Sequence, residues 1–272
     1  MPDESTGALQ AERPRRFPWR VFWLLLFASL AGAAAAIPLV FEEFHALVQA
    51  APRPSIPLPL LIAVGIAQNA ILLAVVIGVG LLLARKLELG APLIESWLYH
   101  KPPRTSARDS LKSGVPVGIS VGIVVLVGLL IAAPHLPGLP FVAAGRAAVW
   151  KRVGVCFYGG IVEEVICRLF LLSLLGWLGT RVFQKQKARM FTATFWSANI
   201  IVAILFGLGH LPNAAMVMHI TPTVVVLALT LNGIAAIPFG YLYWKRGLES
   251  AMIAHFCADF VIYVVGVTLL RV

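Results

Sequence analysis

The sequence has little charge for its length. Only 12% of its 272 residues are Asp, Glu, Lys or Arg, whereas 60% are hydrophobic and the mean hydropathy is +0.89. Soluble domains carry about a quarter charged residues. So little charge cannot cover a water-facing surface, which argues against a soluble enzyme, a disordered chain and a nucleic-acid-binding arm. The net charge of +10 instead indicates cytoplasmic loops that face anionic lipid headgroups.

Cysteine is scarce and odd in number, and two further signatures are missing. Cys156, Cys167 and Cys257 lie in apolar stretches, so we expect small buried hydrophobes and no disulfide framework. The sequence lacks the alternating ten-residue segments of a transmembrane β-barrel. It also lacks an internal repeat, which weakens an inverted-repeat transporter. The sequence therefore predicts an all-α, polytopic membrane helix bundle.

Seven stretches are long and apolar enough to cross a bilayer, which needs roughly 20 residues of helix. Residues 190–244 contain no Asp, Glu, Lys or Arg, and Pro212 and Pro222 divide them into two spans. The predicted transmembrane helices are residues 21–40, 56–84, 115–133, 153–178, 191–211, 223–244 and 250–270.

The loops between these spans alternate in charge. With the N-terminus in the cytoplasm, the inside segments hold 16 Lys and Arg and the outside segments hold 5. This bias holds at every loop, as the positive-inside rule requires. We therefore expect an integral multi-pass protein with a cytoplasmic N-terminus. The Ala- and Arg-rich composition looks like that of a bacterial inner-membrane protein.

The chain is expected to have three regions. Residues 1–20 form a disordered basic segment, residues 21–145 a three-helix region with an interfacial segment near 87–112, and residues 150–270 a catalytic core of four helices. The first span, with arginines before it and small residues at its end, has two interpretations. It is either a cleaved signal peptide or a retained helix, and its length favours the retained helix.

Four charged residues lie inside predicted spans, namely Glu163, Glu164, Arg168 and Asp259. Each costs roughly 2.5–3.5 kcal/mol to place at a helix centre. Such residues usually face a polar cavity with a function, and the alternative is a buried ion pair that locks helices together. Glu164 and Arg168 are four residues apart on one helix face, so they are expected to pair and to leave Glu163 available for chemistry.

Histidines mark two further spans. Phe206 and His210 share a helix face, and His255 and Asp259 share another. Asp259 either fixes the tautomer of the His255 ring or lines the same cavity. Counting along each helix places Glu163 about 15 Å from the outer end of its span and His255 about 10 Å from the inner end. Tilt or a late helix start must reconcile these depths if the groups meet.

Two histidines and two carboxylates are suited to bring a water molecule to an amide bond. Glu163 would deprotonate the water, and His210 and His255, with Asp259, would bind the developing oxyanion or the leaving amine. The same set also fits a zinc site, with Glu163, His210 and His255 as ligands and an open position for water. The sequence lacks an HExxH motif, so no cofactor is favoured and zinc stays the alternative.

These motifs resemble those of the CAAX-protease and bacteriocin-processing (CPBP, or Abi) family, which includes the eukaryotic type II CAAX prenyl endopeptidase. An EExxxR motif stands at residues 163–168, an FxxxH motif at 206–210 and an HxxxN/D motif at 255–259. The resemblance covers roughly residues 150–270. The third motif carries Asp259 where the prenyl-protease branch has Asn, which puts its role as a hydrogen-bond donor in doubt.

The resemblance implies an all-α intramembrane protease. Glu163 would activate water, His210, His255 and Asp259 would shape the oxyanion site, and Glu164, Arg168 and Phe206 would support them. The substrate would be a membrane-tethered or prenylated protein. A proton-coupled transporter and a non-catalytic membrane scaffold of the same family are the alternatives.

Overall fold

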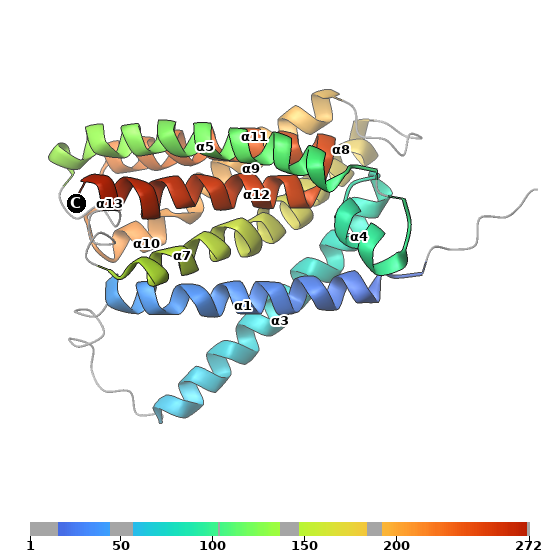
Figure 1. Ribbon diagram of the computed structural model, residues 1–272, viewed down its shortest axis with the longest axis horizontal. Helices are drawn as coiled ribbons and strands as arrows, with labels where there is room; N and C mark the ends of the chain where they lie inside the picture. The colour runs from blue at the N-terminus through green and yellow to red at the C-terminus, as the bar shows by residue number, and fades with distance from the viewer. Residues whose placement is uncertain (1–15, 44–56, 103, 137–146, 184–191, 271–272) are drawn as a thin grey trace, which may run out of the picture.

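The computed structural model describes residues 16–43, 57–102, 104–136, 147–183 and 192–270. This part of the chain is helical throughout its regular structure, which confirms the all-α prediction. Most of the helices run along the long axis of one bundle, while α3 crosses it obliquely (Figure 1). The predicted disordered segment 1–20 lies largely outside the described residues.

The helices follow one another along the chain with short connections. The elements are α1 Trp19–Glu43, α3 Leu58–Lys86, α4 Pro92–Tyr99, α5 Ala107–Ala132, η1 Ala133–His135, α7 Val149–Phe157, η2 Tyr158–Glu163, η3 Val165–Leu172, α8 Ser173–Phe183, α9 Thr192–Gly209, α10 Leu211–Ala215, α11 Pro222–Arg246, α12 Leu248–Asp259, η4 Phe260–Gly266 and α13 Val267–Leu270.

Six helices are long and apolar enough to cross a membrane. They are Trp19–Glu42, Pro59–Lys86, Ala107–His135, Thr192–Ala215, Pro222–Arg246 and Leu248–Leu269. The chain is therefore an integral multi-pass membrane protein. The remaining predicted span, residues 153–178, carries three charges and lies in an uninterrupted helical stretch over 149–183 that changes between α and π geometry. Seven spans stay a prediction.

One predicted boundary is wrong. The third span was expected to begin at residue 115, but α5 begins at Ala107, where the Ser106 hydroxyl accepts a hydrogen bond from the Asp109 backbone N–H at 3.0 Å. Residues 107–112 are therefore the start of α5. The physical reason is that a capped helix extends past its apolar run, with its charged residues at the end of the bundle.

Glycines on α5 bring it against α12, the helix that carries His255. A Cβ atom at Gly114 or Gly122 would meet α12 backbone carbonyls within 3 Å, and one at Gly118 would overlap the Ala254 carbonyl. Small residues at i, i+4 and i+8 let two membrane helices approach this closely. This contact fixes the position of α12, and Gly247, with φ +105°, makes the tight junction between α11 and α12.

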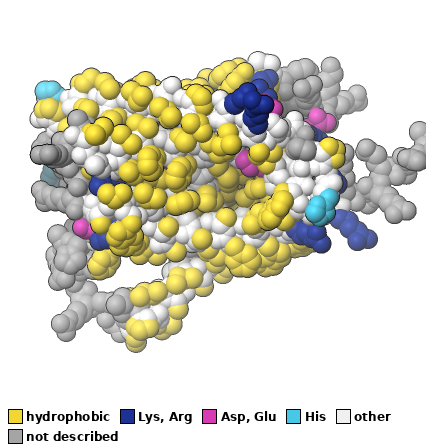
Figure 2. All heavy atoms as spheres, in the orientation of Figure 1, with side chains coloured by type: hydrophobic (Ala, Val, Ile, Leu, Met, Phe, Trp, Pro, Cys, Tyr) yellow, Lys and Arg dark blue, Asp and Glu magenta, His cyan; other side chains and the backbone are white. Residues whose placement is uncertain are grey.

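Large apolar side chains cover the outside of the bundle. Figure 2 shows hydrophobic side chains over most of the visible flank, with Lys and Arg mainly at the end where α4 lies. Trp23, Ile71 and Val226 are about half exposed or more, a surface suited to lipid and not to water. Helix α1 is packed on α7, η2 and α3.

Candidate active site

The first motif lies where the helical stretch over 149–183 widens into π geometry. Glu163 ends η2, Glu164 follows it, and η3 begins at Val165. A π-helical turn changes the angle between successive side chains and often marks a functional site. Here it accompanies two adjacent carboxylates that both point toward one imidazole on α12.

Glu164 and Arg168 form the predicted intrahelical ion pair. Arg168 Nη1 lies 2.9 Å from Glu164 Oε1, and both side chains are almost fully buried. Arg168 Nη2 also donates to the Ala236 carbonyl at 3.0 Å, and the guanidinium lies 5.6 Å from the ring centres of both Phe206 and Phe239. Two aromatic faces, a carbonyl and a carboxylate thus compensate for burial of this cation.

His255 joins the two carboxylates from the opposite helix. Its Nδ1 lies 2.7 Å from Glu164 Oε1. Its Nε2 lies 3.5 Å from Glu163 Oε2 and 3.7 Å from Asp259 Oδ2. Glu164 therefore lies behind the imidazole, and Asp259 lies beside Nε2 in the shared cavity. This arrangement also brings Glu163 and His255 together although counting along their helices placed them at different depths.

His210 completes the polar set at the end of α9. Its Nδ1 lies 2.8 Å from the Phe206 carbonyl oxygen. Its ring packs edge-to-face on Phe206 at 4.6 Å between centres, and Phe206 in turn lies 5.9 Å from the His255 ring. Phe206 therefore contacts Arg168 and both histidines.

One cavity of about 660 Å³ contains all four predicted catalytic residues. Glu163, His210, His255 and Asp259 line it, and its other walls are largely apolar side chains of α1, α5 and α11. The side chains of Glu163 and Asp259 retain 21% and 13% of their exposure, whereas Glu164 retains none. Glu163 therefore faces the space where a substrate would lie, whereas the Glu164 side chain lies in the protein interior.

Gly159 and Gly160 make this meeting of helices possible. A Cβ atom on Gly159 would fall on the Asp259 carboxylate and the His255 ring, and one on Gly160 would press on Phe256. The predicted close approach of another helix at these glycines is confirmed. Any larger residue at 159 would displace the catalytic set itself.

Two residues of the site have no counterpart in the sequence prediction. Phe239 packs on the His255 ring at 5.0 Å and on Arg168, but nothing distinguishes it from any other apolar residue of its span. Asn232 lines the cavity from α11, where its Nδ2 donates to the Ala228 carbonyl at 2.8 Å. Asn232 could have been identified from the sequence, because Asn is unusual in a charge-free span.

The donor set was also compared with the needs of a metal ion. Within the described parts of the chain, no group of three or more His, Cys, Asp and Glu side chains has a metal-binding arrangement. The zinc alternative, with Glu163, His210 and His255 as ligands, therefore stays a prediction. The mechanism below is derived from the side chains of the site.

The ordered motifs and their shared cavity agree with a comparison to protein families. A family model described as type II CAAX prenyl endopeptidase Rce1-like matches residues 145–261. This segment is an Rce1-like domain. The match confirms the resemblance to the CAAX-protease family and supports a membrane protease of the CAAX type. Comparisons with curated proteins and with solved structures gave no significant match.

The Rce1-like domain does not build its cavity alone. All three motifs lie inside the matched segment, but α1 and α5 precede it and supply apolar wall residues such as Ala33, Ile37, Val121 and Val125. The helices before the domain are therefore part of the site.

Proposed function

We propose that this protein is an intramembrane endopeptidase in which Glu163 activates a water molecule to hydrolyse a peptide bond of a membrane-tethered protein. The observation that supports this most is the arrangement around His255, with Glu164 behind its Nδ1 and Glu163 beside its Nε2 at one cavity wall. A carboxylate and an oriented imidazole that share a cavity in an apolar environment meet the geometric need of general acid–base catalysis.

The reaction follows from these positions. Glu163 takes a proton from water, and the resulting hydroxide attacks the carbonyl carbon of the scissile bond. His210 and His255 already direct Nδ1 at the Phe206 carbonyl and at Glu164, so each donates its Nε2–H, as an imidazolium, to the oxyanion that develops on the carbonyl oxygen. The C–N bond then breaks, and Glu163 returns the proton to the leaving amine. The separation of 3.5 Å between Glu163 and His255 leaves both groups free to contact the reacting atoms.

Asp259 is proposed to hold the imidazole and not to contact the oxyanion. Its carboxylate lies beside His255 Nε2, where it contacts the ring and limits its orientation. The two ring nitrogens then face Glu164 and the cavity. This assignment keeps the Asp259 carboxylate off the oxyanion.

The side chains that line the cavity indicate the class of substrate. The cavity is lined mainly by apolar residues from α1, α5 and α11, so a lipidated or membrane-anchored peptide fits it better than a water-soluble one. Membrane-tethered and prenylated peptides are therefore the first substrates to test.

The direct experiment compares Glu163→Gln with Glu88→Gln in proteoliposomes that contain such peptides. Glu88 is an exposed carboxylate in the pocket beside α4, away from the catalytic cavity. We expect Glu163→Gln to lose at least about a hundredfold in cleavage rate and Glu88→Gln to keep the wild-type rate. Chelators are expected to leave the wild-type rate unchanged.

Unchanged cleavage by Glu163→Gln would remove Glu163 as the base. A chelator-sensitive rate with zinc found by elemental analysis would replace the proposed mechanism by a metal-dependent one. Ion flux that disappears in Glu163→Gln, without cleavage by the wild type, would indicate the transporter alternative. Absence of both cleavage and ion flux in the wild type would leave the non-catalytic scaffold as the remaining alternative.

A further inference from the structure

Basic residues gather at one end of the bundle. At this end α1 and α5 begin, α3 and α11 end, and α4 lies across the helices (Figures 1 and 2). Its described Lys and Arg residues are Arg16, Arg20, Arg85, Lys86, Lys101, Arg104, Arg108, Lys112, Arg181, Lys245 and Arg246. We call it the basic end.

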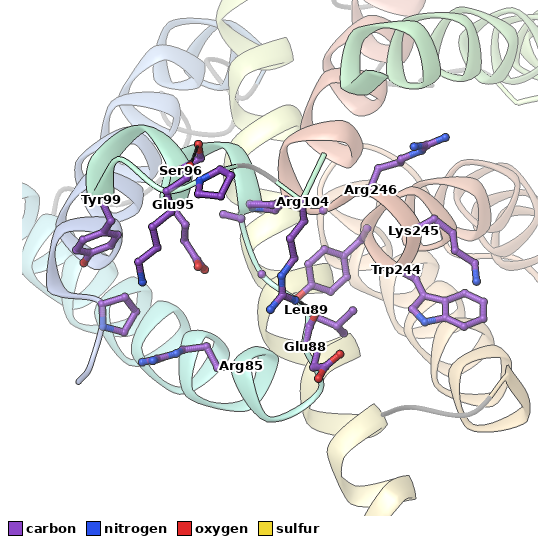
Figure 3. A pocket seen from close by; sticks show the side chains of 18 of the residues that line it. Arg85, Glu88, Leu89, Glu95, Ser96, Tyr99, Arg104, Trp244, Lys245 and Arg246 are labelled. Carbon is purple, nitrogen blue, oxygen red and sulfur yellow. Dashed lines mark hydrogen bonds between the residues drawn. The ribbon is translucent and has the colours of Figure 1, made fainter. Parts of the chain in front are cut away.

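Part of the basic end is a pocket of about 580 Å³. Figure 3 shows Arg85, Arg104 and Lys245 around it, with Glu88 and Glu95 among them. Cations outnumber carboxylates in its lining, and Tyr99 and Trp244 add aromatic rings. Basic pockets with aromatic residues at helix ends are typical of the cytoplasmic leaflet with its anionic headgroups.

Among the residues that the structure describes, the opposite end has few positive charges. In the described segments it carries only Lys151 and Arg152 at the start of α7. Lys151 is paired with Glu42 at 2.6 Å. Arg152 is buried and donates to the Tyr263 carbonyl and the Thr268 hydroxyl. By the positive-inside rule this end faces away from the cytoplasm.

The catalytic cavity lies toward this second end. Its lining comes from the later halves of α1 and α5, from the start of the stretch over 149–183, from α10, and from α11 between Val224 and Phe239. None of the basic-end Lys and Arg residues listed above lines it. Asn213, exposed on α10, and Met218 mark its outer wall.

We propose that the active-site cavity opens on the extracytoplasmic face, so that this protein cleaves anchored proteins in the outer half of the membrane. The inference rests on the proposed function for its substrate and on charge and cavity position for its direction. Ile37, Val40 and Phe41 support it from α1, because these exposed apolar side chains line the cavity where an anchored segment would enter from lipid.

The lining also restricts the substrate. It contains Glu163 and Asp259 but no Lys or Arg. Its carboxylates favour neutral or basic segments beside the membrane anchor.

Cysteine labelling tests the direction. Met216→Cys lies beside the cavity at an exposed position, and Lys101→Cys lies at the basic end. A membrane-impermeant maleimide added to intact cells is expected to label Met216→Cys and to label Lys101→Cys only after permeabilisation. The wild type, with its three native cysteines, gives the background. Labelling of Lys101→Cys but not of Met216→Cys in intact cells would overturn the proposal. If either variant folds poorly, protection of an N-terminal tag from external protease provides a second test of the direction.

A sided cleavage assay tests the substrate. Proteoliposomes sorted by orientation receive an anchored peptide with its cleavable segment on one side only. Cleavage is expected only on the side where Met216→Cys is labelled, and not in Glu163→Gln. Cleavage only on the Lys101 side would overturn the direction and keep the protease. Absence of cleavage on both sides would remove the proposed function, while the labelling result still decides the direction.

Discussion

Glu164 connects three parts of the site through one buried carboxylate. It contacts Arg168 on its own helix and His255 on α12, and Arg168 reaches α11 through the Ala236 carbonyl. Glu163, next to it, is partly exposed to the cavity and has no such network. Adjacent residues of the same type thus have different surroundings, one within a buried network and one at the cavity.

This difference predicts opposite phenotypes for two neighbouring substitutions. Glu164→Ala leaves Arg168 buried and unpaired, so we expect a loss of about 3–5 kcal/mol in the free energy of unfolding. Glu163→Ala is expected to change stability by less than about 1 kcal/mol while it abolishes cleavage. Thermal unfolding in one detergent measures both, and equal losses of stability would contradict the assignment.

Asp259 gives a second prediction. Asn is nearly the same shape as Asp and keeps a polar contact with His255 Nε2, so Asp259→Asn is expected to retain kcat/KM within about tenfold. Asp259→Leu removes the contact and is expected to lose about a hundredfold. Cleavage of the same anchored peptide by both variants measures this. An inactive Asp259→Asn with wild-type stability would show that the charge itself is required.

The pairing of α5 with α12 sets the position of the catalytic histidine. Gly118 lies against the Ala254 backbone, one residue before His255. A methyl group there cannot be accommodated by side-chain movement, because the obstacle is main chain. The helices must separate, and the His255 ring moves with α12.

Gly118→Ala is therefore expected to cost about 1–3 kcal/mol in stability and to lower cleavage as well. Gly65→Ala on α3 is a matched control, since a Cβ atom there meets nothing within 4 Å. It is expected to be neutral or to stabilise by about 0.5–1 kcal/mol. If both variants unfold at the same temperature, the close α5–α12 contact does not hold the site in place.

Local spacing explains what the sequence could predict of these elements. Residues four apart on a helix share a face, so the Glu164–Arg168 pair and the common face of His255 and Asp259 follow from the sequence. The contact of Glu164 with His255 does not follow, because it depends on how two helices cross. The π geometry of η2 and η3 has no local signal, and neither has the selection of Phe239 among many apolar residues.

For the whole molecule, too, some features could be predicted from the sequence and others could not. Hydropathy locates the long apolar helices because lipid demands them, and six are found. The stretch over 149–183 is not among these six; it changes between α and π geometry and carries Glu163, Glu164 and Arg168 near its centre. The start of α5 was predicted eight residues late. The apolar stretch begins only after the charged residues, whereas the helix begins earlier, at its N-cap Ser106.

The arrangement of the whole bundle also explains how costly charges persist in it. Arg168 and Glu164 are compensated by each other, by His255 and by aromatic rings. Glu163, Asp259 and His210 share a cavity that water can enter. Acid and imidazole groups on separate membrane helices therefore converge on one reaction space.

An experimental structure in lipid nanodiscs tests this convergence most directly. We expect the Glu163 carboxylate about 3.5 Å from His255 Nε2, with His210 at the same cavity and ordered water between the three groups. A Glu163 side chain directed at acyl chains, or far from both imidazoles, would contradict hydrolysis by a Glu163-activated water.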